Sequence, residues 1–191
     1  MFLDILGATL GLLYLWLEVK ENVWMWLVGS VMPVIYIVVL YQAGLYADCG
    51  MEVYYFLAGM YGLWYWLRHS GSKGGAERVS ITTTPRSQVL PLVAVTLALW
   101  AALLWFLITF TDSRVPYVDG FTTALSIVAM WMLSRKYTEQ WLVWFVVDAI
   151  SAGLYVYKGV YGRAILYSVY TIMAVYGYLK WRRACTTQAK S

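Results

Sequence analysis

Seven long apolar segments, separated by shorter polar ones, divide the chain from end to end. They cover about residues 2–18, 23–43, 48–67, 88–110, 117–134, 141–157 and 162–181. Each is long enough to cross a hydrocarbon core ~30 Å thick as an α-helix. Because helices satisfy every backbone polar group within the segment, the pattern predicts an all-α integral membrane protein with seven transmembrane helices.

The composition agrees with a protein that lies in a membrane. Hydrophobic residues make up 62% of the chain and charged residues 13%, whereas charged residues approach a quarter of a soluble domain. The net charge of +4 does not indicate a nucleic-acid partner, because the basic residues stand at the ends of apolar segments, where they orient a membrane protein.

The basic residues predict an orientation. Of the 14 Lys and Arg residues, only Arg114, Lys158 and Arg163 fall on the side that carries the N-terminus. The others lie on the opposite side, many of them in the polar loop 68–87 or after residue 179. The positive-inside rule therefore predicts a multi-pass protein with its N-terminus outside and its C-terminus in the cytoplasm.

The two halves of the chain resemble each other at an offset of 115 residues. Matched pairs include Asp4 with Asp119, Leu10 with Leu125, Trp16 with Trp131, and then Gly44, Tyr46, Tyr55, Tyr61, Gly62, Trp66 and Arg68 with Gly159, Tyr161, Tyr170, Tyr176, Gly177, Trp181 and Arg183. Between these blocks a slip of three residues aligns Glu21 with Glu139, Trp26 with Trp144, and Ser30 with Asp148. The pattern predicts an internal repeat.

Each repeat holds three predicted spans, so a second copy following directly would be inverted. The fourth span, 88–110, restores the orientation and gives a 3+1+3 arrangement of parallel repeats. We divide the chain into a first three-helix repeat (1–67), a basic cytoplasmic loop with a linker helix (68–116), a second repeat (117–183) and a cytoplasmic tail (184–191). Parallel repeats are typical of transporters, with the substrate near the membrane midplane; the alternative is a duplication without transport.

Two acidic residues, Asp148 and Glu52, lie clearly inside predicted spans, where ionisable groups are costly and usually functional. Helical spacing places Trp141, Trp144, Asp148 and Ser151 on one face, and Glu52, Tyr55, Gly59, Gly62 and Trp66 on another. Carboxylates and tryptophan faces together favour a flat, cationic ring as ligand. The alternatives are tryptophans that anchor the membrane interface, and acids that share a proton or bond a neighbouring helix.

The sequence contains few of the residues and motifs that enzymes use for catalysis. His69 is the single histidine and stands at the edge of the basic loop, so no histidine-based metal site or nucleophile–base pair is expected inside the membrane. There is no glycine-rich phosphate loop and no zinc-peptidase motif. We therefore expect a protein that is not an enzyme and uses no cofactor or metal; a membrane enzyme or receptor for a lipid-soluble ligand is the weaker class.

The motifs resemble those of a known family. They are Glu52-x-x-Tyr55-x-x-x-Gly59-x-Tyr61-Gly62-x-Trp64-x-Trp66, then Leu125-Ser-Ile-Val-Ala-Met130, Ser134-Arg-Lys-Tyr137, Trp141-x-x-Trp144-x-x-x-Asp148 and Gly159-Val-Tyr161. Together they resemble the Pnu vitamin transporters over nearly the whole chain. The resemblance implies a fold similar to full-length SWEET transporters, a homotrimer in the bacterial inner membrane, and facilitated diffusion of a vitamin that cytoplasmic phosphorylation then traps.

The resemblance also bears on the substrate. Members that carry nicotinamide riboside typically have Gln, Asn and Asn at the positions of Glu52, Gly59 and Asp148. Nicotinamide riboside and thiamine are both cationic, but carboxylates can also accept hydrogen bonds from the aminopyrimidine of thiamine, whereas a carboxamide gains from amide partners. We therefore expect a transporter closest to the thiamine-type members, with nicotinamide riboside as the alternative and a non-transport membrane protein as a weaker one.

Overall fold

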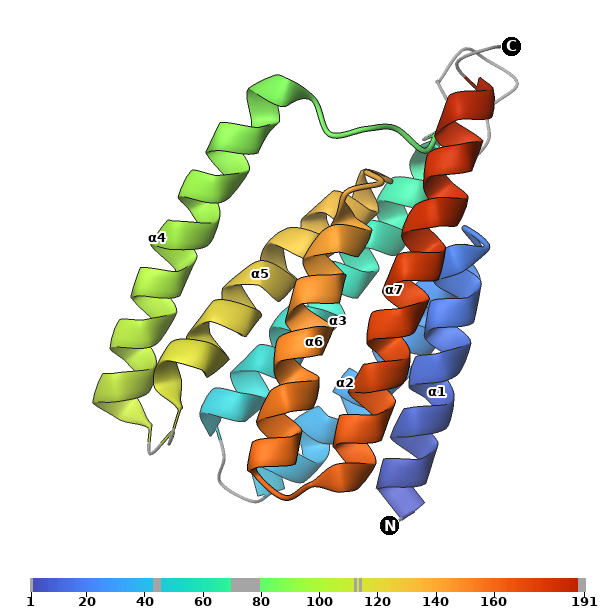
Figure 1. The fold of residues 1–191 in the computed structure, drawn as a ribbon. Coiled ribbons are helices and arrows are strands. Elements are labelled where there is room, and N and C mark those ends of the chain that lie inside the picture. Colours follow the sequence, from blue (N-terminus) through green and yellow to red (C-terminus); the bar gives the residue numbers. More distant parts are fainter. Residues whose placement is uncertain (1, 43–45, 70–79, 112, 114, 189–191) are drawn as a thin grey trace. The chain divides into compact units, whose positions relative to one another are not determined.

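The computed structural model describes residues 2–42, 46–69, 80–111, 113 and 115–188. Within them the chain forms seven α-helices (Figure 1): α1 (Phe2–Val19), α2 (Trp24–Gln42), α3 (Tyr46–His69), α4 (Arg86–Phe110), α5 (Pro116–Ser134), α6 (Gln140–Tyr157) and α7 (Tyr161–Gln188). Six of them begin and end within two residues of a predicted apolar segment. The seventh is longer, because the predicted tail 184–191 is helical as far as Gln188.

Four of the helices in the described residues, α2, α4, α5 and α6, are long and apolar enough to cross a membrane. The apolar part found in α1, Ile5–Val19, is shorter. In α3 and α7 five tyrosines each reduce the hydropathy, although tyrosine is well suited to a membrane interface. The all-α class is confirmed; the crossing of the membrane by all seven helices stays a prediction.

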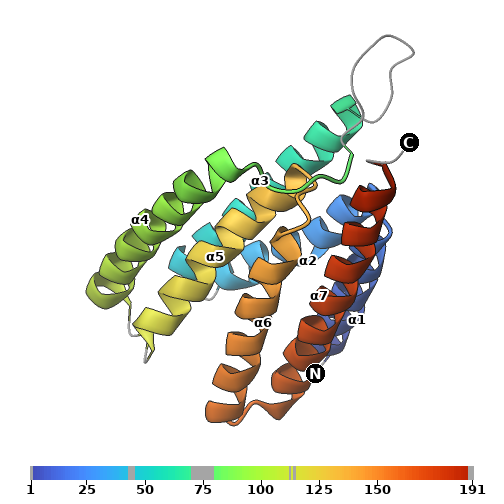
Figure 2. The same ribbon diagram turned by 45° about the horizontal axis from the view of Figure 1, so that its top comes forward.

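The chain divides into two compact units, Met1–Val79 and Ser80–Ser191. In the first unit α2 packs on both α1 and α3, and in the second α6 packs on both α5 and α7 (Figure 2). The second unit also holds α4, which packs on α5, so the predicted linker helix is joined to the helices that follow it. Residues 70–79 of the predicted basic loop and 189–191 of the tail lie outside the described residues.

The turn after α1 in the first unit and the turn after α5 in the second have the same backbone conformation. Glu21, after α1, has a φ of 56°, and Lys136, after α5, has a φ of 55°. The N–H groups of the next residues donate back to helix carbonyls, Asn22 to Leu17 at 2.9 Å and Tyr137 to Met132 at 3.0 Å. Such a left-handed residue closes a helix by satisfying its last carbonyls. Glu21 thus corresponds to Lys136, at an offset of 115.

In the first unit a tryptophan fits over a glycine. A Cβ atom added at Gly62 of α3 would lie only 2.3–2.5 Å from ring atoms of Trp26 of α2. The Trp26 ring also meets the edge of Trp66, with centroids 5.5 Å apart and planes at 89°. Both tryptophans are buried. We call Trp26, Gly62 and Trp66 the first tryptophan triad.

The second unit repeats this contact between α6 and α7. A Cβ atom at Gly177 would lie 2.6–2.7 Å from the Trp141 ring, and Trp141 meets Trp181 with centroids 5.6 Å apart and planes at 88°. These three residues form the second tryptophan triad. Each of its members lies 115 positions after a member of the first, so Trp26 corresponds to Trp141.

The slip of three residues that aligned Glu21 with Glu139, Trp26 with Trp144 and Ser30 with Asp148 is therefore wrong. It rested on residue identities, whereas the turn conformation and the triads keep one register of 115 throughout.

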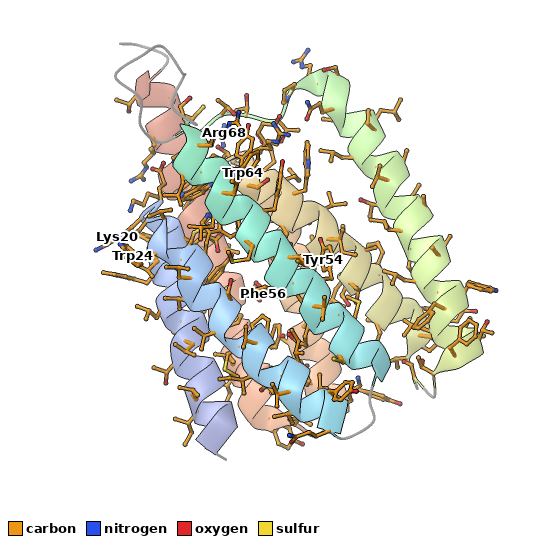
Figure 3. The ribbon with its side chains drawn as sticks, turned by 180° about the vertical axis from the view of Figure 1, so that it is seen from behind. Lys20, Trp24, Tyr54, Phe56, Trp64 and Arg68 are labelled. Atoms are coloured by element: carbon orange, nitrogen blue, oxygen red, sulfur yellow. The ribbon has the colours of Figure 1, made fainter. Side chains whose placement is uncertain are left out.

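Figure 3 shows the first unit from behind, with Lys20 and Trp24 at the turn between α1 and α2 and with Arg68 near the end of α3.

A short segment before α4 is tied to the turn between α5 and α6. The N–H of Thr82 donates to the carbonyl of Lys136 at 3.2 Å, and the N–H of Thr138 donates to the carbonyl of Thr82 at 2.9 Å. The backbone N–H and the hydroxyl of Thr84 both donate to the Glu139 carboxylate at 2.7 Å. These bonds fix the start of α4 relative to α5 and α6.

The triads generate a stability prediction. Gly177→Ala places a methyl group where the Trp141 ring lies, and we expect a loss of ~1–3 kcal/mol from overpacking, or several degrees in the thermal midpoint of the purified protein. Gly153→Ala on α6 is the matched control, because nothing lies within 4 Å of an added Cβ there. Equal midpoints for the two variants would contradict the close approach of α6 and α7.

Candidate functional site

The carboxylate of Asp148 is the central feature of the second unit. Its residue is 6% exposed on α6, in the middle of a helix that is apolar enough to cross a membrane. Within the described residues no hydrogen-bond donor or cation reaches this carboxylate. A desolvated acid without a partner is costly, so the arrangement favours a partner that arrives from outside the protein.

Two predicted neighbours of Asp148 remain accessible on the same helix. Trp144, one turn earlier, and Ser151, one turn later, are each half-buried. The indole N–H of Trp144 is buried and, in the part of the chain that the structure describes, has no hydrogen-bond partner. The phenol group of Tyr170 on α7 lies close enough to Asp148 for the two side chains to interact electrostatically. An aromatic face, an acid and hydroxyl groups thus lie near one another.

The first unit carries its predicted residues along α3. Glu52 and Tyr55 are half-buried, and Gly59 is buried. A Cβ atom at Gly59 would lie 3.0 Å from the hydroxyl oxygen of Ser30, which donates its proton to the carbonyl of Trp26 at 2.7 Å. The absence of a side chain at Gly59 therefore lets α2 approach α3 beside Glu52 and Tyr55.

Two other predicted site residues are packing residues of the triads. Trp141 is 0% exposed and Trp66 is 4% exposed, and each has its ring against the other members of its triad. These contacts leave no ring face for a ligand. Substrate binding by Trp141 or Trp66 stays a prediction that the packing does not favour, and Trp144 is the tryptophan next to Asp148 that remains half-buried.

Sequence reasoning missed a second buried acid in the described residues. Glu18 was read as the end of the first apolar segment, yet it is 1% exposed. The side chain of Tyr14, one turn earlier, is hydrogen-bonded to it, and the Tyr14 ring lies 2.9 Å from where a Cβ would stand at Gly29 of α2. The spacing of four between Tyr14 and Glu18, opposite a glycine in the next segment, is the signal that could have found this pair.

At the corresponding positions of the second unit, the large and small residues are exchanged between the two helices. At an offset of 115, Tyr14 corresponds to Ala129, Glu18 to Leu133, and Gly29 to Trp144. Ala129 and Leu133 are both 0% exposed. The large ring therefore comes from α1 in the first unit and from α6 in the second, which places it on the same helix as Asp148.

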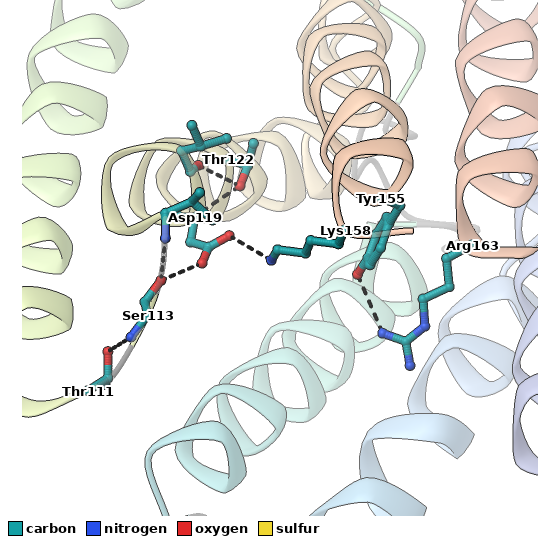
Figure 4. A network of polar contacts seen from close by, with 9 residues as sticks. Thr111, Ser113, Asp119, Thr122, Tyr155, Lys158 and Arg163 are labelled. Atoms are coloured by element: carbon teal, nitrogen blue, oxygen red, sulfur yellow. Dashed lines mark hydrogen bonds and ion pairs between the residues drawn. The ribbon is translucent and has the colours of Figure 1, made fainter. Parts of the chain in front are cut away.

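The carboxylate of Asp119 has polar partners within the second unit. Its carboxylate accepts a hydrogen bond from the Ser113 hydroxyl at 2.7 Å and lies 3.8 Å from the Lys158 ammonium (Figure 4). These contacts join α5 to the segment before it and to the turn between α6 and α7. In the described part of the chain, no group of three His, Cys, Asp or Glu side chains could hold a metal ion.

Helices that can cross a membrane, together with a buried acid within one of them, indicate an integral membrane protein, and such acids are typical of transport pathways. A sequence profile of the nicotinamide mononucleotide transporter family matches residues 1–183. The chain belongs to this family, which is the Pnu family of the motifs above.

Characterised relatives are similar over almost the whole chain. The nicotinamide riboside transporter PnuC of Escherichia coli K12 is 24% identical, with 94% of this chain and 84% of the relative covered. PnuC of Neisseria mucosa is 25% identical, covering 93% and 70%. The riboflavin/roseoflavin transporter RibM of Streptomyces davaonensis is also 25% identical, covering 93% and 83%.

The fold is similar to that of a solved transporter. The crystal structure of the vitamin B3 transporter PnuC superimposes with a TM-score of 0.77 at 25% identity, covering 97% of this chain and 83% of the other. The relatives support vitamin transport, and their names favour nicotinamide riboside over the thiamine that we expected from the two acids.

The contrast between the two tryptophans of α6 can be tested by stability. Trp141→Ala removes a fully buried ring, and we expect a loss of ~3–5 kcal/mol in the free energy of unfolding. Trp144→Ala removes a half-buried ring and should cost about half as much or less. Trp26→Ala, the counterpart in the first unit, serves as the reference for Trp141. Thermal unfolding in detergent measures all three, and a greater loss for Trp144 would contradict the assignment.

Proposed function

We propose that the protein carries nicotinamide riboside across the bacterial inner membrane by facilitated diffusion, and that cytoplasmic phosphorylation traps it. The observation that carries this proposal is the match to PnuC in sequence and fold along nearly the whole chain. The N-terminus lies outside and the C-terminus in the cytoplasm, as the basic residues predict.

In this proposal Asp148 recognises the positive charge of the nicotinamide ring. The carboxylate is almost fully buried and lacks a partner among the described residues, so a cation gains more from it than it would from an acid in water. Trp144 offers its ring for stacking and its indole N–H for a hydrogen bond to the carboxamide oxygen. Ser151 supplies a further polar contact one turn along the helix.

From the first unit, Glu52 and Tyr55 bind the ribose. A carboxylate accepts hydrogen bonds from two adjacent hydroxyl groups, and a phenol both donates and accepts. Gly59, one turn after Tyr55, has no side chain. A Cβ atom there would meet the Ser30 hydroxyl. Each unit thus carries one of the two acids that we propose for substrate binding.

The two acids favour the riboside over the phosphorylated nucleotide that the family name mentions. A phosphate group carries nearly two negative charges at neutral pH, and a carboxylate beside it would repel it. The riboside has no phosphate and keeps the cationic ring. The negative charge of the site therefore favours the riboside over its phosphorylated form, the nucleotide.

Thiamine is the second candidate, and the same acids support it. It is a cation, and its aminopyrimidine donates hydrogen bonds that a carboxylate accepts. The positions of Glu52, Gly59 and Asp148 depart from the amides typical of nicotinamide riboside carriers. The relatives named above are transporters of nicotinamide riboside or riboflavin, which places thiamine second.

The architecture belongs to the proposal as well. The equal turns and triads at an offset of 115 support two parallel three-helix repeats joined by α4, in the 3+1+3 arrangement of full-length SWEET transporters. The boundaries are those predicted, namely 1–67, 68–116, 117–183 and 184–191. Assembly as a homotrimer follows the resemblance to the family.

Flux measurements test the function. Proteoliposomes that contain the purified protein should equilibrate labelled nicotinamide riboside without an energy source, and unlabelled riboside should compete better than thiamine or nicotinamide mononucleotide. Stronger competition by thiamine would establish the second candidate. Liposomes that take up none of these vitamins faster than protein-free vesicles would show that the proposed function is wrong.

The role of Asp148 can be tested through charge alone. Asp148→Asn should weaken binding of nicotinamide riboside about ten-fold, since a charge-assisted contact contributes ~1.5–3 kcal/mol and the amide oxygen replaces part of it. Dihydronicotinamide riboside, whose ring is uncharged, should bind the variant within about two-fold of the parent.

Asp119→Asn is the matched control, because it makes the same chemical change in an acid that already pairs with Ser113 and Lys158. It should leave both affinities unchanged. Equal weakening of the charged and uncharged ligands by Asp148→Asn, measured by calorimetry, would show that the carboxylate does not recognise the positive ring.

A further inference from the structure

Four helices carry an aromatic residue and a basic residue four positions later near their C-terminal ends. The pairs are Trp16–Lys20 at α1, Trp64–Arg68 at α3, Trp131–Arg135 at α5 and Tyr178–Arg182 at α7, with the cation 3.7, 5.2, 5.5 and 5.9 Å from the ring centroid. A spacing of four places both side chains on one helical face. We call these four the aromatic–basic pairs.

The pairs of the first unit are turned away from the protein. Trp16 is 50% exposed and Trp64 is 51% exposed, and their basic partners are exposed too. Figure 3 shows Trp64 and Arg68 near the C-terminal end of α3 and Lys20 at the end of α1. Among the residues that the structure describes, no carboxylate lies within ion-pair distance of Lys20, Arg68 or Arg182.

Basic residues at the turn between α6 and α7 are placed differently. Lys158 lies 3.8 Å from the Asp119 carboxylate, and Arg163 donates to the Tyr155 hydroxyl at 3.5 Å (Figure 4). At that turn the cations have partners within the protein. At the ends of α1, α3 and α7 the cations have a ring on one side and no anion on the other.

In a membrane, the phosphate groups of the lipids are a suitable partner for such a pair. Tryptophan and tyrosine prefer the depth of the lipid headgroups, and a cation held over the ring stays at the same depth. The phosphates of the lipids lie there, and each basic residue near an anionic surface contributes about 1 kcal/mol of attraction. Since α1 and α3 run in the same direction when α1, α2 and α3 all cross, the two pairs of the first unit meet one leaflet.

We propose that the Trp16–Lys20 and Trp64–Arg68 pairs of the first unit are a binding surface for anionic phospholipids of the cytoplasmic leaflet. Each ring enters the boundary between headgroup and acyl chain, and its cation binds the lipid phosphate. The surface holds the ends of α1 and α3 at one depth. It is separate from the vitamin site and does not depend on which vitamin is carried.

Quenching by brominated lipids tests this surface. The full-length protein is reconstituted in phosphatidylcholine vesicles with increasing brominated phosphatidylglycerol, and tryptophan fluorescence gives the binding constant of one lipid relative to the other. The parent should prefer phosphatidylglycerol, and Lys20→Gln with Arg68→Gln should lower the preference at least five-fold. Lys180→Gln with Arg183→Gln is the matched control, because it also removes two exposed positive charges of that end, with no ring contact among the described residues.

The control should lower the preference clearly less than the paired variant does, and Lys20→Arg with Arg68→Lys should retain it. Equal losses in the paired and control variants would overturn the proposal, because net charge alone would then explain binding. A parent without any preference for phosphatidylglycerol would overturn it too. If the double variant fails to fold in phosphatidylcholine, as judged by its thermal midpoint, Arg68→Gln and Arg183→Gln are compared singly with the same criteria.

Discussion

The fit of one indole ring over one glycine, made once in each unit, is the contact on which the rest of the structure depends. In a membrane the lipid tails are as apolar as the side chains, so helices associate through close packing more than through the hydrophobic effect. Gly62 and Gly177 remove the side chain that would keep the helices apart, and Trp26 and Trp141 fill the space. In this way α2 is held against α3, and α6 against α7.

This contact fixes rotation as well as distance. When Trp141 lies over Gly177, the residues seven positions further along α6 lie on the same helical face. Asp148 is such a residue, so its burial follows from the position of Trp141. The triad therefore positions the helix, and the acid is buried on the same face.

Hydropathy was enough to predict the helices and most of their ends, because apolar length is a local property of the chain. It did not predict that α7 continues to Gln188 or that α4 belongs with α5, since helix propensity and packing decide these features. Residue identities led to the wrong register between Glu21 and Glu139, because aromatic and acidic residues recur by chance and the conformations at Glu21 and Lys136 are visible only in the structure.

The candidate site was predictable only in part, and for a similar reason. An acid in an apolar helix is conspicuous, so Asp148 could be found from sequence, and the structure buries it. Helical spacing tells which residues share a face but not which neighbour covers that face, so Trp66 and Trp141 were read as ligand contacts although their triads enclose them. Glu18 was missed because a segment end normally lies near water.

A duplicated transporter needs two units that pack alike and yet treat one substrate differently. The triads and turns supply the first property, because they are equal in both units. The exchange of large and small residues bears on the second: Tyr14 covers Gly29 in the first unit, whereas in the second unit Ala129 has the position of Tyr14 and Trp144 that of Gly29. The exchange roughly preserves the packed volume, which is the kind of change that helix packing tolerates best. It also moves the aromatic ring onto the helix of Asp148, so the repeat keeps its scaffold while the two units present different residues on corresponding faces.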